Sequence, residues 1–236
     1  MQMPVKLRLI YMAKVGQHPL LTSQYPVATV NCMKIIDAKK TLTLVGLLLL
    51  FSNGVFATDI VRLVTMCEEC HGKDGNSTHP DVPIIAGFSH EGFLNTMDVF
   101  RENERIAIRF HKPGEPETVM NEIAQELSDK DVEELADYFS RRPFIAAKQT
   151  SDAAQAARGE IIHKQKCEKC HYGNGADPVE DAAILAGQWT IYLRRQFDNI
   201  LSGKRIVPRS MLRRIKKLSA EDIEDLLHFY ALQGSK

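Results

Sequence analysis

The pattern of hydrophobic and polar positions predicts helices, and no convincing alternating run between them indicates a strand. Two segments carry apolar residues at i, i+3, i+4 and i+7, which is one face of a helix. They are Val132, Leu135, Ala136 and Phe139 in the first, and Ile223, Leu226, Leu227 and Tyr230 in the second. A capping box precedes each, Ser128-x-x-Asp131 and Ser219-x-x-Asp222. The predicted class is all-α.

Two further helices are predicted to lead into short cysteine motifs. Apolar or partly apolar positions recur at three-to-four spacing in each of them. They are Ile60, Val64 and Cys67 before the first motif, and Ala157, Ile161 and Lys164 before the second.

The motif Cys-x-x-Cys-His occurs twice, at Cys67, Cys70 and His71 and again at Cys167, Cys170 and His171. An offset of one hundred also aligns Gly75 with Gly175, Ala86-Gly87 with Ala186-Gly187, Arg105-Ile106 with Arg205-Ile206, and Arg109 with Arg209. The offset then becomes ninety-one and aligns Met120 with Met211, Leu127-Ser128 with Leu218-Ser219, Asp131 with Asp222, and Leu135 with Leu226. We therefore predict one domain used twice, over 58–147 and 148–236, with a nine-residue insertion within 110–119 whose Pro and Gly content suits a surface loop.

The repeated motif predicts covalent haem. A domain of about ninety residues has little core of its own, so a large apolar group would stabilise it. Two thiols can add to the haem vinyl groups while the adjacent histidine ligates the iron. A thioredoxin-like pair would need a βαβ setting, and a zinc site or a disulfide between neighbours would leave the repeated histidine without a role. We expect two covalently bound haem c groups.

Met120 and Met211 are the predicted sixth ligands, because the repeat places them in register and thioether sulfur is a known partner of haem histidine. Met66 and Met97 have no methionine counterpart and are expected to be core residues. The rival ligands His79, His90, His111 and His228 do not recur; His111 lies in the insertion. Two filled iron positions favour electron transfer over catalysis at the haem.

The N-terminal region is predicted to be removed on export. From Met33 the chain has a basic segment, an apolar run over 42–51 and a small-residue site ending at Ala57, which together indicate a signal peptide over 33–57. The apolar run is too short for a stable membrane span. Residues 1–32 then precede the true start as a mis-assigned leader, and Cys32 has no expected role.

Charge is unevenly divided in the mature chain. Residues 58–147 hold 9 basic and 18 acidic groups, whereas residues 148–236 hold 15 and 11. Such asymmetry steers a partner, but the weak basicity gives no reason to expect nucleic-acid binding. No G-x-G-x-x-G follows a strand pattern, so the chain is not expected to bind a flavin itself.

The doubled arrangement of Cys-x-x-Cys-His, Ala-Gly, and Met before a Leu-Ser-x-x-Asp helix resembles the dihaem class I cytochromes c. Several short segments are most similar to the cytochrome subunit of flavocytochrome c sulfide dehydrogenase. They are "CHGKDGNS", "FLNTMDVF", "VMNEIA", "LADYF", "AAKQTSD", "KCEKCH" and "ILAGQWTIYL". That resemblance implies two tandem domains, each around one haem, in a periplasmic protein whose partner is a sulfide-oxidising flavoprotein. The word "SGKRIVPRSM" is closer to the free dihaem shuttles, which deliver electrons to a terminal oxidase or another acceptor.

The resemblance also suggests how the axial histidines are oriented. Pro83 stands where class I cytochromes c have the proline whose carbonyl accepts from the histidine, and Ala183 is its counterpart in the second copy. The arginines that recur in the repeat are candidates to pair with the haem propionates. The alternative for each is an ordinary exposed surface position. These arginines are Arg105, Arg109, Arg205 and Arg209.

Overall fold

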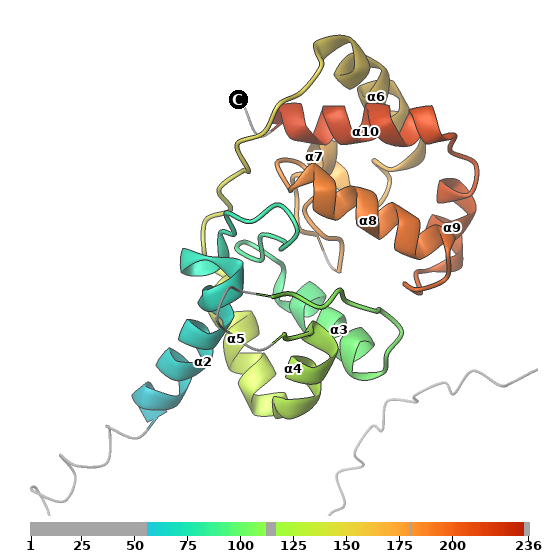
Figure 1. Cartoon of the computed structure of the whole chain (residues 1–236). Helices are drawn as coiled ribbons and strands as arrows, with labels where there is room; N and C mark the ends of the chain where they lie inside the picture. Colours follow the sequence, from blue (N-terminus) through green and yellow to red (C-terminus); the bar gives the residue numbers. More distant parts are fainter. Residues whose placement is uncertain (1–55, 112–116, 180, 234–236) are drawn as a thin grey trace, which may run out of the picture. The chain divides into compact units, whose positions relative to one another are not determined.

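The computed structural model describes residues 56–111, 117–179 and 181–233 (Figure 1). The predicted leader, Cys32 and the signal peptide up to residue 55 lie outside the described residues. The described helices all belong to one compact unit, Leu49–Lys236. Within the described residues, no helix is both long enough and apolar enough to span a bilayer.

The first domain is built from four helices and a 3-10 turn, coloured blue to yellow-green in Figure 1. They are α2 (Phe56–His71), η1 (Lys73–Gly75), α3 (His90–Arg101), α4 (Met120–Glu126) and α5 (Asp129–Ser140). Helix α5 starts at the predicted capping box, with both reciprocal hydrogen bonds present. Its predicted apolar face is buried, together with Leu63, Val64 and the aromatic residues of α3. The expected core of this domain is confirmed.

The second domain repeats this order in the yellow-to-red helices of Figure 1. They are α6 (Ala153–Lys166), α7 (Tyr172–Gly175), α8 (Thr190–Leu201), α9 (Arg209–Ile215) and α10 (Ala220–Gln233). Leu226, Leu227 and Tyr230 of α10 are buried as expected, and Ile223 packs against them. The predicted box at Ser219 is formed, since Asp222 exchanges hydrogen bonds with it.

Equivalent glycines make the same backbone contacts in both domains. The carbonyl of Gly75 accepts from Ile85 and Ala86, and that of Gly175 accepts from Leu185 and Ala186. Both glycines have positive φ, 78° and 83°, which favours glycine over residues with a side chain. The sequence repeat is therefore a structural repeat.

One expectation for the second entry helix, its buried face, is wrong. Helix α6 buries Ala156, Gly159 and His163, whereas Ala157, Ile161 and Lys164 are exposed. The reason is a close approach to α10, because a Cβ on Gly159 would lie 2.0 Å from the carbonyl oxygen of Asp225. The two motifs differ in their local structure. The second lies in a turn after α6, whereas the first lies within the last turns of α2.

No strand is found in the described part of the chain, which has only two isolated β-bridges. One joins Phe110 to Thr118 and closes the base of the insertion; residues 112–116 between them are outside the described residues. The other joins Arg105 to Arg205 and so links the two domains. Its hydrogen bonds run from Ile106 N to Lys204 O at 2.9 Å and from Ile206 N to Glu104 O at 2.8 Å.

Candidate functional site

The first cysteine motif places a buried histidine at the end of α2. The ring of His71 is 7% exposed, and its Nδ1 lies 2.8 Å from the carbonyl oxygen of Pro83. Burial lowers the pKa of His71, which favours the neutral ring. A carbonyl can only accept, so Nδ1 carries the proton and Nε2 keeps a lone pair for a metal.

The thiols of this motif stand on the same turn. Cys67 packs against the first core, and burial raises the pKa of its thiol to about 12. Glu68, between the two cysteines, accepts from the backbone N–H of Asp74 at 2.7 Å and so fixes the loop after the motif. Gly72 begins this loop with φ 74°, where a Cβ would meet the carbonyl oxygen of Asn76 at 2.3 Å.

The second motif repeats these contacts with a looser histidine. The Nδ1 of His171 lies 3.3 Å from the carbonyl oxygen of Ala183, and burial lowers the pKa of the ring. Glu168 accepts from Gly173 N and Asn174 N, as Glu68 does from Asp74. Cys167 packs against the second core, whereas Cys170 is exposed.

The predicted methionine ligands lie in the first turns of equivalent helices. Met120 begins α4 and lies half-buried against the first core, which Cys67 also contacts. Met211 lies half-buried in the first turn of α9. Met97 is 4% exposed inside the first core, as expected of a core residue.

Asn121, which sequence reasoning missed, fixes the loop beside Met120. Its amide donates to the carbonyls of Phe100 and Arg105, both at 2.9 Å, and its Oδ1 accepts from Ala107 N. The second copy has Leu212 at this position, so the repeat gave no sign of it.

Three rival histidines have other partners. The Nδ1 of His228 accepts from Asp152 N at 3.0 Å, and His79 packs edge-on against Phe110. His90 lies 3.3 Å from the carboxylate of Glu133. His111 is exposed at the edge of the insertion.

Arg105 and Arg205 bring two positive charges together in the domain interface. Their guanidinium groups share Gln196 Oε1, and Arg105 also donates to Tyr192. Burial, and after it the charge of Arg105, lowers the pKa of Arg205 to about 9. Among the described residues, no carboxylate pairs with either group. For Arg109 the structure bears out the alternative of surface exposure, since it is exposed and pairs with Glu122.

These residues fit a haem. Each copy offers two motif cysteines, a histidine with a free Nε2 and a methionine, and the unpaired guanidinium groups suit the carboxylates of a haem edge. In the described ranges, no group of three or more His, Cys, Asp or Glu side chains could hold a metal ion.

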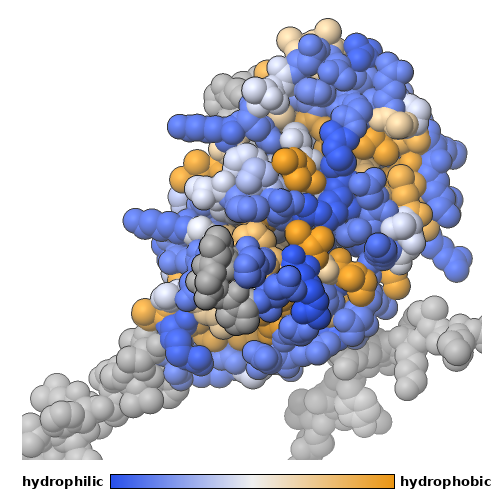
Figure 2. All heavy atoms as spheres, viewed as in Figure 1, coloured by the Kyte–Doolittle hydropathy of each residue, from blue (hydrophilic) through white to orange (hydrophobic). Residues whose placement is uncertain are grey.

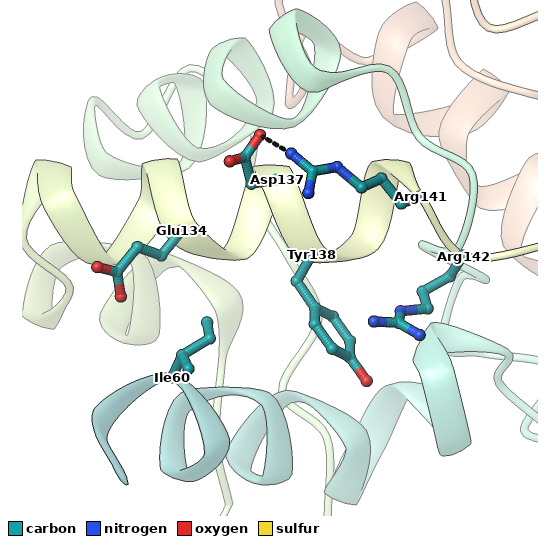
Figure 3. Close-up of a pocket in the computed structure, with 6 residues that line it drawn as sticks. All are labelled: Ile60, Glu134, Asp137, Tyr138, Arg141 and Arg142. Carbon is teal, nitrogen blue, oxygen red and sulfur yellow. Dashed lines mark ion pairs between the residues drawn. The ribbon is translucent and has the colours of Figure 1, made fainter. Parts of the chain in front are cut away.

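A surface hollow in the first domain lies apart from these residues. Figure 3 shows it between α2 and α5, lined by Ile60, Glu134, Asp137, Tyr138, Arg141 and Arg142. None of the predicted cofactor ligands lines it.

Exposed apolar side chains occur in both domains, among them several in the second. Figure 2 shows orange residues over the region of α8 and α9 within a largely hydrophilic face. Ile191 and Leu201 of α8 and Ile206 before α9 are 50%, 43% and 59% exposed.

Comparison with known proteins identifies the family. No protein-family model matches the chain. Cytochrome c4 of Stutzerimonas stutzeri is 30% identical over 189 residues, which are 72% of this chain and 85% of that protein. The chain belongs to the cytochrome c4 family. The crystal structure of reduced cytochrome c4 from Pseudomonas stutzeri matches with a TM-score of 0.58 and 30% identity, over 71% of this chain and 93% of that one.

A more distant structure shares the fold alone. Thiosulfate dehydrogenase from Marichromatium purpuratum is 21% identical with a TM-score of 0.57, over 70% of this chain and 36% of that one. The match to cytochrome c4 confirms the all-α class with two cytochrome c domains. As a member of that family, the chain is an electron-transfer protein with two covalently bound haem c groups.

Proposed function

We propose that this chain is a periplasmic one-electron carrier whose two haems are each held by two thiols, one histidine and one methionine. The first set is Cys67, Cys70, His71 and Met120, and the second is Cys167, Cys170, His171 and Met211. The observation that carries this proposal is the common orientation of two histidines, the buried His71 and the half-buried His171. Each directs Nδ1 at a backbone carbonyl twelve residues further on, which leaves Nε2 available to iron.

The haem supplies the one-electron couple, and the chain's residues keep its surroundings fixed. Burial and the hydrogen bond at Nδ1 prevent the His71 ring from turning when the charge on the iron changes. Met120, half-buried against the first core, would hold the haem iron as its sixth ligand in place of water, and thioether ligation would favour the reduced state. A site that binds no substrate and moves little suits rapid electron exchange.

The ligand assignment predicts the effect of Met211→His. A second imidazole favours the ferric state more than a thioether does, so one of the two reduction potentials should fall. One of the two contributions to the weak sulfur-to-iron band in the far-red spectrum should also disappear. Met97→Leu is the matched control, since it removes a buried methionine that is no ligand and should leave both quantities unchanged. An unaltered far-red band in Met211→His would place the sixth ligand elsewhere.

The electron donor is proposed to be a flavoprotein that oxidises sulfide. The support is the resemblance of words such as "FLNTMDVF" and "AAKQTSD" to the cytochrome subunit of that class of enzyme. The cytochrome c4 relatives support the second candidate, a free shuttle that delivers electrons to a terminal oxidase. Export by the segment 33–57 and covalent haem attachment suit either role in the periplasm.

The two roles differ in how the protein is reduced. With the flavoprotein as donor, sulfide should reduce this cytochrome only when the flavoprotein is present, and the two should stay together on a sizing column in about half-molar salt because a stable interface is partly apolar. A native preparation that carries no flavin absorbance and is reduced efficiently by a respiratory donor would assign the shuttle role.

A further inference from the structure

Gln188 of the second domain makes two hydrogen bonds to one residue of the first domain. Its Oε1 accepts from the backbone N–H of Ile84, and its Nε2 donates to the backbone carbonyl of Ile84, both at 3.0 Å. Gln188 is 3% exposed and Ile84 is 1% exposed, so water does not compete for these bonds. Because an N–H can only donate and a carbonyl can only accept, this pairing also fixes the orientation of the amide.

The N–H of Ile84 belongs to the same peptide group as the carbonyl of Pro83. That carbonyl accepts from Nδ1 of His71 at 2.8 Å. A continuous chain therefore runs from Gln188 Oε1 through the Pro83–Ile84 peptide group to the ring of His71. Hydrogen bonds in such a chain polarise one another, and the effect is larger in a buried, low-dielectric setting.

The second domain also fixes the segment that leads to this peptide group. Trp189 Nε1 donates to the carbonyl of Ser77 at 3.1 Å. The guanidinium of Arg195 donates to the backbone carbonyl of Asp81 at 3.1 Å and pairs with its carboxylate. These contacts hold residues 77–84 in place but do not touch the peptide group that His71 uses.

The arrangement is not repeated for the second haem. The offset of one hundred places Phe88 opposite Gln188, and a phenyl ring has no group that could bond a peptide. The His171 contact to Ala183 is also longer, 3.3 Å against 2.8 Å for His71. The chain of hydrogen bonds from Gln188 therefore acts on the haem of the first domain alone.

We propose that Gln188 is a positioning residue through which the second domain lowers the reduction potential of the haem in the first domain. By accepting from the Ile84 N–H, it makes the Pro83 carbonyl a stronger acceptor. The His71 ring then gains electron density, and an electron-rich axial imidazole favours ferric iron. This inference rests on the proposed role of His71 as an iron ligand.

The test is Gln188→Leu in the holoprotein, with both potentials measured by spectroelectrochemical titration. The potentials are assigned to each haem from the paramagnetically shifted signals of the axial ligands. We expect the first-haem potential to rise and the second to stay in place. In reduced protein labelled with ¹⁵N-histidine, the Nδ1–H signal of His71 should move upfield while that of His171 does not.

Trp189→Phe is the control, because it removes a contact in the same interface without touching the peptide group. Unchanged potentials in Gln188→Leu, equal shifts of both haems, or an equal first-haem shift in Trp189→Phe would each overturn the proposal. Should Gln188→Leu fail to fold, Gln188→Met offers the same loss of hydrogen bonds with an unbranched side chain. His71→Ala separates the two proposals, since a variant that kept the wild-type low-spin spectrum would refute the ligand assignment itself.

Discussion

At the residue scale, Arg105 and Arg205 are two like charges placed side by side without an acidic partner in the described chain. Neutral acceptors, Gln196 and the Tyr192 hydroxyl, supply their hydrogen bonds. Burial, and after it the like charge of Arg105, lowers the pKa of Arg205, so the charged pair is unfavourable by itself. A bound group with carboxylates would remove the repulsion and give each guanidinium a charged partner.

The charge of Arg205 should therefore act on the second haem. Burial lowers the pKa of His171, and the charge of Arg205 lowers it further. In Arg205→Gln, the loss of a positive charge should favour ferric iron and lower the second-haem potential. A charge-assisted hydrogen bond of about 1.5–3 kcal/mol would correspond to ~65–130 mV for a one-electron couple. Potentiometric titration measures this shift in the second-haem potential. The control is Arg213→Gln, which replaces an exposed arginine on α9 and should show no such shift.

Sequence reasoning found the residues that recur and missed those that do not. The orientation of His71 by Pro83 was predicted and is present. His163 was missed because its counterpart is the apolar Leu63. In the structure its ring is fully buried, with Nδ1 3.0 Å from the Tyr230 hydroxyl and Nε2 2.6 Å from Glu168. A single polar residue in a helix carries no periodic pattern that reveals a buried partner.

At the scale of elements, the helices that close each domain were predicted in position and face, whereas α6 was predicted to lead into the second motif but with the wrong buried face. Periodicity assigns a helix face from its large apolar side chains, and α6 has few of them. Its packing instead depends on the absence of a side chain at Gly159 and on the bidentate pair of Arg158 with the buried Asp225, with both distances 2.7 Å. A helix that packs closely through glycine has no stripe of large apolar side chains, so the sequence pattern does not indicate its buried face.

The capping box of α5 gives a prediction at this scale. Ser128→Ala removes the acceptor for Asp131 N and should cost about 1 kcal/mol in the free energy of unfolding at neutral pH. Hydrogen bonds from Ser128 lower the pKa of Asp131, so this contribution exists above the ordinary carboxyl pKa and is lost as the pH falls through the lowered value. The cost of Ser128→Ala should therefore shrink in acid.

Urea unfolding followed by circular dichroism at several pH values measures this cost. Ser202→Ala is the control, because its exposed hydroxyl donates to the Asp198 carbonyl and caps no helix start. A cost for Ser128→Ala that did not exceed that of Ser202→Ala would contradict a role for the box in stability.

At the scale of the molecule, the two-domain organisation followed from residues that match at a constant offset within each of two stretches of the chain. Finding such a match needs no knowledge of packing. The contacts between the domains could not be read in the same way. Gln188, Trp189 and Arg195 face Ser77, Asp81 and Ile84, and none of these contacts joins equivalent positions. A repeat reveals what two copies share, whereas an asymmetric interface is made from their differences.

The bridge between Arg105 and Arg205 is the exception, because it joins a position to its own counterpart. Ile106 donates to Lys204 and Ile206 donates to Glu104, so each copy gives the other the bond that it receives. Reciprocal contact of this kind is the hallmark of an isologous interface, the type that joins the subunits of a two-fold symmetric dimer. The linked chain thus holds, inside one polypeptide, a contact of the kind that pairs two identical subunits.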